Sequence, residues 1–241
     1  MTPRLRAIGL EKSYRGKKVV DGISVNIERG EIVGLLGPNG AGKTTTFSMI
    51  IGLVPLDAGR IYLGEEDITE MPMYRRAQKG LSLLPQEPSA FRRLSVENNL
   101  RAILQVLPDS PSRGDADIDG VLEEFGLERL ARSKAFTLSG GERRRLEIAR
   151  AMLTRPEFVL LDEPFTGIDP LAIQDLQRII RGLKDRGLGL VITDHSVRET
   201  LKITDRAYII DKGRILMEGR PQELVESESV KRSYLGDDFT L

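Results

Sequence analysis

The sequence predicts an α/β fold: a mixed sheet flanked by helices, with an antiparallel β edge and an inserted helical subdomain. Two observations lead to this expectation. Short apolar runs alternate with amphipathic stretches, which is typical of parallel strands joined by helices. Residues 87–154 instead have a helical composition and separate two regions that show this alternation. We therefore expect one domain whose sheet is built from both ends of the chain.

Length and composition limit the alternatives. The 241 residues are enough to bury a core, and the expected parts of the single domain 1–241 are an α/β core (1–86 and 155–220), a helical subdomain (87–154) and a C-terminal helical tail (221–241). Lys and Arg number 36, as do Asp and Glu, so no overall field recruits nucleic acid or anionic lipid. With no cysteine, disulfides and thiolate zinc sites are excluded. The start has no apolar signal core, and the longest uncharged apolar stretch, Thr44 to Leu56, is well short of a ~20-residue span, so we expect neither a membrane crossing nor export.

The N-terminal region predicts the antiparallel edge. Runs from Leu5 to Leu10 and from Lys18 to Ile27 are followed by the apolar run from Glu31 to Leu36, a buried strand. Tyr14 lies between the first two runs among basic residues. Its ring could stack on a base, although a turn tyrosine is more often a half-buried anchor.

A glycine-rich stretch follows that buried strand. Residues Gly37, Pro38, Asn39, Gly40, Ala41, Gly42, Lys43 and Thr44 fit the phosphate-loop pattern. Glycines let backbone N–H groups turn inward around phosphate oxygens, and the dipole of a helix beginning at Lys43 favours the anion. We expect Lys43 to reach the β and γ phosphates, Thr44 to bind Mg²⁺, and Thr45 to lie in the same site. The fold class is therefore a phosphate-loop NTPase core; the plainer alternative is a turn without ligand.

Polar residues follow the next strands. Gln86 comes after the expected strand from Leu81 to Leu84 and could be a ligand of Mg²⁺ or water, or merely a loop glutamine. The apolar run from Phe158 ends in Asp162 and Glu163. Ligands lie at the carboxyl ends of strands in open α/β sheets. Asp162 could therefore hold Mg²⁺, and Glu163 could orient or deprotonate a water.

The only histidine, His195, follows the expected strand from Leu188 to Thr193. A lone histidine is usually structural, but this one is predicted to share a sheet edge with Glu163 and Gln86. A helix capped by Asp169 precedes that strand, and a hairpin over 206–218 and a helix from Pro221 follow it.

The inserted region carries its own signals. Ser95 opens an expected helix over 96–107, and a second amphipathic stretch covers 118–125. Ser139 and Glu142 form a capping-box pattern before a helix that reaches Leu153. The three arginines at 143–145 oppose the helix dipole, which suggests a nearby anion; the alternative is a solvated basic face.

Taken together, these residues resemble the nucleotide-binding subunit of ATP-binding cassette (ABC) transporters over essentially the whole chain. The matching elements, in order, are Tyr14, Gly37 to Thr44, Gln86, Leu138 to Glu142, Leu160 to Glu163, Asp169 and His195. The resemblance implies that Tyr14 stacks on adenine, Gln86 senses Mg²⁺ and the γ phosphate, Glu163 is the catalytic base and His195 contacts the γ phosphate. Gly167 and Ile168 depart from the more usual Ala-Leu, a change we expect to be mild.

The resemblance also implies partners. Ser139, Gly140, Gly141 and Glu142 would bind the ATP of a second copy, which gives a homodimer around two ATP with Mg²⁺. Membrane subunits would bind near Phe91 and Arg92, so association with the cytoplasmic face of the inner membrane is peripheral. No nucleic acid partner is expected. The other interpretation of Phe91 is a plug between the subdomains.

Within the family, the phrases around Phe91, Glu142 and Tyr234 are most similar to ATPases of lipopolysaccharide export systems. ATPases of branched-chain amino acid importers are a close alternative, and non-transport ABC proteins of ribosomes or DNA a more distant one. A regulatory GTPase lacks support because the guanine-reading Asn-Lys-x-Asp pattern is absent.

Overall fold

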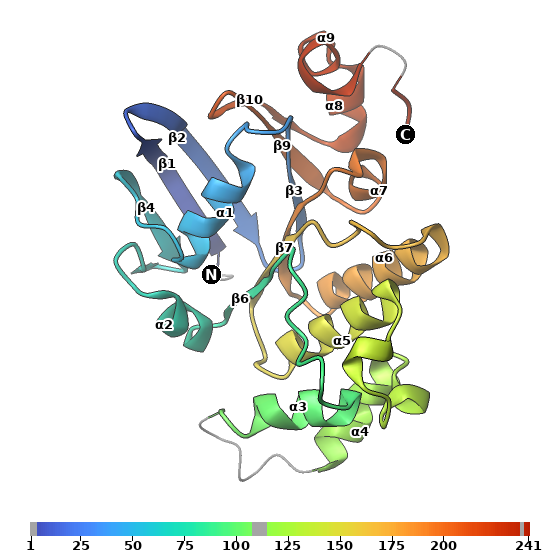
Figure 1. Ribbon diagram of the computed structural model, residues 1–241. Helices are drawn as coiled ribbons and strands as arrows, with labels where there is room; N and C mark the ends of the chain where they lie inside the picture. Colours follow the sequence, from blue (N-terminus) through green and yellow to red (C-terminus); the bar gives the residue numbers. More distant parts are fainter. Residues whose placement is uncertain (1–3, 108–114, 237–238) are drawn as a thin grey trace.

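The computed structural model describes residues 4–107, 115–236 and 239–241. Its centre is a six-stranded sheet in the order β10-β9-β3-β8-β7-β6, in which β10 alone runs antiparallel to its neighbour (Figure 1). The strands are β3 (Ile32–Leu36), β6 (Leu81–Leu84), β7 (Phe158–Asp162), β8 (Gly189–Thr193), β9 (Arg206–Asp211) and β10 (Arg214–Gly219). The α/β class is thus confirmed, because sequence-distant strands form one mixed sheet.

The N-terminal strands form a second, antiparallel sheet in the order β2-β1-β4-β5. Its strands are β1 (Arg4–Tyr14), β2 (Lys17–Glu28), β4 (Ala58–Leu63) and β5 (Glu66–Asp67). Helix α1 (Lys43–Ile51) shares one apolar core with both sheets, to which it contributes Phe47, Met49, Ile50 and Ile51. The expected antiparallel edge is therefore a separate sheet packed across α1 from the central one.

A second apolar core covers the other face of the central sheet. It joins Val159, Leu161 and Ile192 of the sheet to the apolar sides of helices from the inserted region. These helices are α3 (Val96–Leu104), α4 (Asp115–Glu124) and α5 (Gly140–Met152), and α6 (Pro170–Asp185) lies beside α5 (Figure 1). The helix expected over 96–107 ends at Leu104. The sequence also predicts a loop from Pro108 to Asp115, rich in Pro, Ser and Asp, which lies almost entirely outside the described residues.

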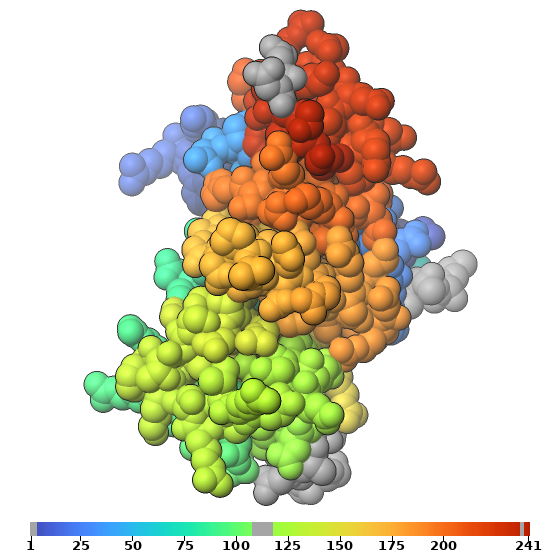
Figure 2. All heavy atoms as spheres, turned by 90° about the vertical axis from the view of Figure 1, so that its right-hand side faces the viewer, coloured from blue at the N-terminus to red at the C-terminus, as the bar shows by residue number. Residues whose placement is uncertain are grey.

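The remaining helices lie along the rim of the central sheet: α2 (Met73–Gln78), α7 (Val197–Leu201), α8 (Pro221–Glu226) and α9 (Glu228–Val230). Tyr234, Leu235 and Phe239 of the tail pack with α8 and α9 on a third small core that includes Leu36 and Leu201. Figure 2 shows the tail above the α6 and α7 region, with the helical subdomain below. The tail therefore covers the back of the strand that leads into the glycine-rich loop.

Candidate functional site

The glycine-rich loop joins β3 to α1, and its glycines are required by neighbouring backbone. Gly37, Gly40 and Gly42 have φ angles of 149°, 77° and 107°, in the region that favours glycine. A Cβ atom on Gly37 would lie 2.0 Å from the carbonyl oxygen of Ile210, and one on Gly42 would lie 2.7 Å from that of Val19. The loop can therefore lie this close to β2 and β9 only without side chains at Gly37 and Gly42.

Lys43 begins α1 and folds back over this loop. Its Nζ donates hydrogen bonds to the carbonyl oxygens of Gly37 at 2.6 Å and Pro38 at 3.0 Å. Burial lowers the pKa of the Lys43 ammonium, and the charges of Glu163 and Asp162 act in the opposite direction. The first N–H groups of a helix have no acceptor within it, so the loop presents a cation and free donors to an anion.

Three polar side chains contact the carboxylate of Glu163 beside the loop. Gln86 Nε2 donates to one of its oxygens at 2.7 Å, and Thr166 Oγ1 donates to the same oxygen at 3.2 Å. His195 Nε2 lies 2.6 Å from the other oxygen. The structure thus brings Gln86, Glu163 and His195 together at one sheet edge, as the sequence predicts, and adds Thr166.

The backbone holds Glu163 in an unusual conformation. Its φ angle of 46° lies in the left-handed region that non-glycine residues seldom adopt. The N–H of Glu163 donates to the carbonyl oxygen of Thr193 on β8 at 2.8 Å. Such strain persists where surrounding contacts determine the backbone, and it is often found at functional sites.

Two aspartates, Asp162 and Asp194, accept hydrogen bonds at this sheet edge. Asp162 accepts a 2.6 Å hydrogen bond from Thr193 Oγ1, and burial raises the pKa of its carboxyl while that bond lowers it. Asp194 accepts from the backbone N–H groups of Phe165 at 2.8 Å and Ser196 at 2.7 Å. Burial also raises the pKa of Asp194. Asp194 was not among the predicted site residues, although its position at the end of an apolar strand was a usable signal.

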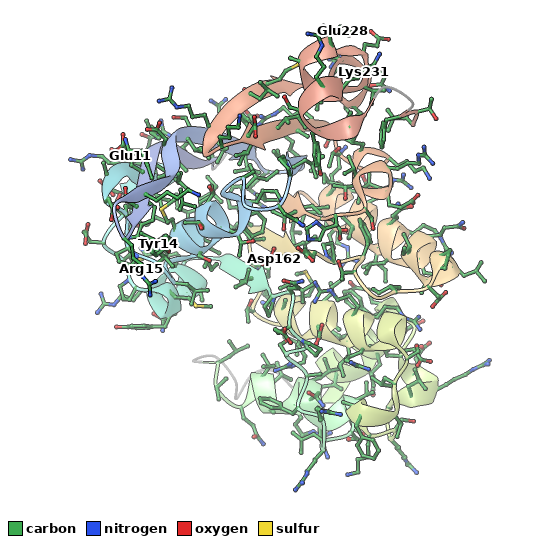
Figure 3. All side chains as sticks on the ribbon, turned by 45° about the horizontal axis from the view of Figure 1, so that its top comes forward. Glu11, Tyr14, Arg15, Asp162, Glu228 and Lys231 are labelled. Atoms are coloured by element: carbon green, nitrogen blue, oxygen red, sulfur yellow. The ribbon has the colours of Figure 1, made fainter. Side chains whose placement is uncertain are left out.

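The loop and Glu163 line one cavity of about 430 Å³. Its lining residues are Val19, Asn39, Gly40, Ala41, Gly42, Lys43, Thr44, Thr45, Gln86, Glu163 and His195. Tyr14, expected here, is instead 45% exposed at the end of β1, with Lys12 Nζ 5.7 Å from its ring centre. Figure 3 shows Tyr14 beside Arg15 at the tip of this strand and Asp162 near the middle of the molecule. Val19, which the sequence analysis did not single out, takes the position next to the loop.

Two of the oxygen donors expected for Mg²⁺, Thr44 and Gln86, line this cavity, whereas Asp162 does not. Thr44 is exposed, and Asp162 and the amide of Gln86 face the same sheet edge. Because Gln86 donates through its nitrogen, its amide oxygen remains the atom that could bind a cation. Mg²⁺ prefers one or two protein oxygens together with phosphates and waters, and this donor set fits that preference. Within the described parts of the chain, no group of three or more His, Cys, Asp or Glu side chains could hold a metal by itself.

Ser139, Gly140, Gly141 and Glu142 lie at the start of α5 and do not line this cavity. The capping box is present: Glu142 N donates to Ser139 Oγ at 3.3 Å, and Ser139 N donates to Glu142 Oε2 at 2.8 Å. A Cβ atom on Gly141 would lie 2.6 Å from Cβ of Ala172 on α6. The second glycine therefore allows α5 and α6 to pack closely, in addition to any role with a ligand.

Each of the three arginines at 143–145 donates to a backbone carbonyl of its own chain, and the expectation of an anion near them stays a prediction. Arg143 donates to the carbonyl oxygen of Leu138, and Arg145 to those of Phe125 and Gly126. Arg144 is 6% exposed and turned into the protein, so the alternative of a solvated basic face is wrong for this residue. All three guanidinium groups donate to backbone carbonyls, although Arg144 Nε has no hydrogen-bond partner among the described residues.

The C-terminal tail contacts elements that form the same site. Burial raises the pKa of the Tyr234 hydroxyl to about 12, although a hydrogen bond with the backbone of Gly37 opposes the shift. Arg198 on α7 donates to the carbonyl oxygen of Thr240 at 2.7 Å, and its guanidinium lies 5.4 Å from the Phe239 ring centre. The tail therefore contacts both the glycine-rich loop and the helix that follows His195.

A larger cavity, of about 820 Å³, lies elsewhere between β4, β5 and α2. Its polar lining includes Arg60 and Asp67, which form a 2.8 Å ion pair with each other. No residue predicted for the site lines it. Size therefore does not identify the functional cavity here, whereas the phosphate loop and the Glu163 cluster do.

Comparison with known proteins gives one family. The ABC transporter family model matches residues 20–166. A probable ABC transporter ATP-binding protein of Azorhizobium caulinodans is 56% identical over 237 residues, which cover 98% of this chain and 84% of that protein. The lipopolysaccharide export system ATP-binding protein LptB of Escherichia coli K12 is 52% identical over 238 residues, which cover 98% of this chain and 99% of LptB.

Solved structures give the same result. The ADP conformation of MJ1267, an ATP-binding cassette of an ABC transporter, matches with a TM-score of 0.88 at 28% identity and covers 98% of this chain and 100% of the other. The match to the family spans the glycine-rich loop, the start of α5 and the Glu163 strand. The chain therefore belongs to the ABC transporter family, as an ATP-binding protein that hydrolyses ATP for transport.

Proposed function

We propose that this chain powers the export of lipopolysaccharide from the inner membrane, as a homodimer that binds two ATP at its interface. The observation that carries the catalytic part is the Glu163 carboxylate, held by Gln86, Thr166 and His195 beside the phosphate loop. The cargo rests on the 52% identity to LptB over nearly the full length of both chains. Peripheral association with the cytoplasmic face of the inner membrane, without nucleic acid, follows from this assignment. The described residues contain no helix that is long and apolar enough to span a bilayer.

The site residues have separate roles in binding and hydrolysing ATP. Lys43 and the loop N–H groups bind the phosphates, and Thr44, Gln86 and Asp162 would hold Mg²⁺, which neutralises phosphate charge when bound. Glu163 accepts a proton from the attacking water, because it is the one carboxylate among the residues that line the cavity with the phosphate loop. Gln86 and His195 orient that carboxylate through their contacts at 2.7 Å and 2.6 Å. Tyr14, exposed at the end of β1, would stack on adenine.

The position of the signature supports a dimer. Ser139 to Glu142 lie outside the chain's own cavity, so a second copy must present its signature there if these residues bind ATP. MJ0796, a cassette that shares this fold with a TM-score of 0.80 at 22% identity, is itself dimeric. Each of the two ATP would then be enclosed by the phosphate loop of one copy and the signature of the other.

Phe91 and Arg92 form the proposed contact with the membrane subunits. The Phe91 ring is 47% exposed, which supports a docking role over a core plug. Buried Asn99 fixes its backbone: Oδ1 accepts from Phe91 N at 2.8 Å, and Nδ2 donates to Phe91 O at 3.1 Å. The guanidinium of Arg150 lies 4.6 Å from the ring centre. An exposed ring on a rigid backbone suits an interface anchor, because little order is lost on binding.

The test is reconstitution with the membrane subunits of lipopolysaccharide export. Phe91→Ala and Arg92→Ala should bind ATP and unfold at the wild-type temperature, yet fail to co-purify with those subunits or to drive lipopolysaccharide release from proteoliposomes. Phe136→Ala is the matched control, since Phe136 is a 56% exposed ring on the same subdomain. A wild-type chain that assembles only with amino acid permeases would reject the cargo, and destabilised Phe91→Ala that still assembles would favour the core plug.

A further inference from the structure

A buried ion pair on α5 has no part in the chemistry above. Arg144 Nη1 and Glu147 Oε2 lie 3.1 Å apart, and the two side chains are 7% and 3% exposed. Among the ion pairs of the described residues, these are the lowest exposures. Burial lowers the pKa of the Arg144 guanidinium, and the Glu147 charge opposes this. A pair this buried is costly to disturb, because either charge left alone would lack solvation.

Arg144 connects α5 to the two strands that carry the catalytic side chains. Its Nη1 donates to the carbonyl oxygen of Pro85 at 2.8 Å, and its Nη2 donates to that of Asp162 at 2.9 Å. These carbonyls belong to the residues immediately before Gln86 and Glu163. One guanidinium thus fixes both backbones just before the two side chains that contact each other.

Glu147 connects the same helix to the segment that leads into Phe91. Its Oε1 accepts hydrogen bonds from the backbone N–H groups of Ser89 at 2.7 Å and Ala90 at 3.3 Å. Arg150, one turn further along α5, donates to the carbonyl oxygen of Ser89. The segment 85–90 is therefore held at both ends by one face of α5.

We infer that Arg144 and Glu147 act as a positioning pair that makes α5, Gln86, Glu163 and the Phe91 segment move as one unit. The inference rests on the proposed function, since α5 begins with the signature and Phe91 is the proposed membrane-subunit contact. Charge-assisted hydrogen bonds in a buried site resist stretching, so a shift of α5 displaces segment 85–90 and the Asp162 backbone with it. ATP-driven motion of the signature thereby reaches Phe91 through α5 as well as through Gln86.

The test compares four variants of the full chain. Glu147→Gln and Arg144→Met each break the pair, Arg144→Met/Glu147→Leu removes both charges together, and Arg145→Met is the control one residue away. Breaking the pair should leave the KM for ATP within about two-fold and lower kcat roughly ten-fold, in the range of coupling between contacting residues. Hydrogen exchange in segment 85–92 should accelerate and lose its response to a non-hydrolysable ATP analogue.

The double variant separates positioning from simple stability. Removing both charges should restore much of the thermal stability lost in the single variants, because no buried charge is left unpaired. It should not restore kcat or the ATP-dependent exchange of 85–92. Recovery of all three together, or a Glu147→Gln chain with wild-type kcat and exchange, would overturn the inference. These measurements need no membrane subunit, so a wrong cargo assignment leaves them valid.

Discussion

The phosphate-loop end and the signature end of the molecule use polar groups differently. At the loop end, Gln86, Thr166 and His195 all converge on Glu163, and Lys43 lies over the loop carbonyls. At the signature end, Ser139 and Glu142 bond each other's backbone, and the arginines that follow bond carbonyls of their own chain. The loop end is thus an assembled site, whereas the signature end is a capped helix start without convergent side chains.

The difference shows that one chain can assemble the residues for proton transfer by itself, but not a complete ATP site that includes the signature. Proton transfer needs a base with fixed partners, and these come from strands of one sheet. The signature offers a helix N-terminus and a serine, which can add only binding energy to an anion delivered from elsewhere. Substitutions at the two ends should therefore fail in different ways.

The largest expected effect is at the loop end. Glu163→Gln keeps the shape of the side chain but cannot accept a proton, so ATP turnover should fall by about 10²–10⁴-fold while ATP binding persists. Turnover and nucleotide retention on the same sample check this. Glu87→Gln is the matched control, since Glu87 is an exposed acid beside Gln86. A Glu163→Gln chain with normal turnover would show that another group is the base.

Mixing defective chains tests whether the two ends act in different copies. Lys43→Ala and Ser139→Ala homodimers should each fail to occlude ATP at either site. Their heterodimer should occlude one ATP, because it contains one intact loop facing one intact signature. Verified heterodimers that retain no ATP would instead place the signature on its own chain's nucleotide, which would remove the contrast between the two ends.

The tail sharpens the comparison through its contact with the loop end. Tyr234 keeps its proton to about pH 12 in the folded chain, whereas an ordinary tyrosine loses it near pH 10. Between these values the unfolded chain binds fewer protons, so stability falls as pH rises, by about 2–3 kcal/mol in total. Tyr234→Phe should lack this component, and denaturant unfolding of both chains from pH 9 to pH 12 measures the difference. Parallel curves would place Tyr234 in an ordinary environment.

The smallest effect concerns the packing of the signature helix. Gly141→Ala puts a methyl group 2.6 Å from Ala172 Cβ, so despite the better helix propensity of alanine we expect a loss of about 1–2 kcal/mol. Gly182→Ala on α6 meets nothing within 4 Å, so it should gain up to about 1 kcal/mol. Opposite signs in chemical denaturation would support close packing of α5 on α6. Stabilisation by both changes would mean that the packing of α5 on α6 does not require a glycine at position 141.

The sequence by itself determined the features that depend on neighbouring residues. The glycine-rich loop between an apolar run and a helix, the acids after the Phe158 run and the capping box at Ser139 all occur as predicted, because each is set by spacings of a few residues. The shared edge of Gln86, Glu163 and His195 followed as well, since parallel strands place their carboxyl ends together.

Only the tertiary structure decided which groups the long side chains contact and which distant segments lie next to each other. Nothing near Arg144 in the sequence indicates that it bonds carbonyls before Gln86 and Glu163, or that Val19 rather than Tyr14 lines the cavity. Tyr234 likewise reaches Gly37 from the far end of the chain. These contacts depend on which segments the fold brings side by side. The local sequence does not predict them, because an arginine or tyrosine side chain can hydrogen-bond to many alternative carbonyls.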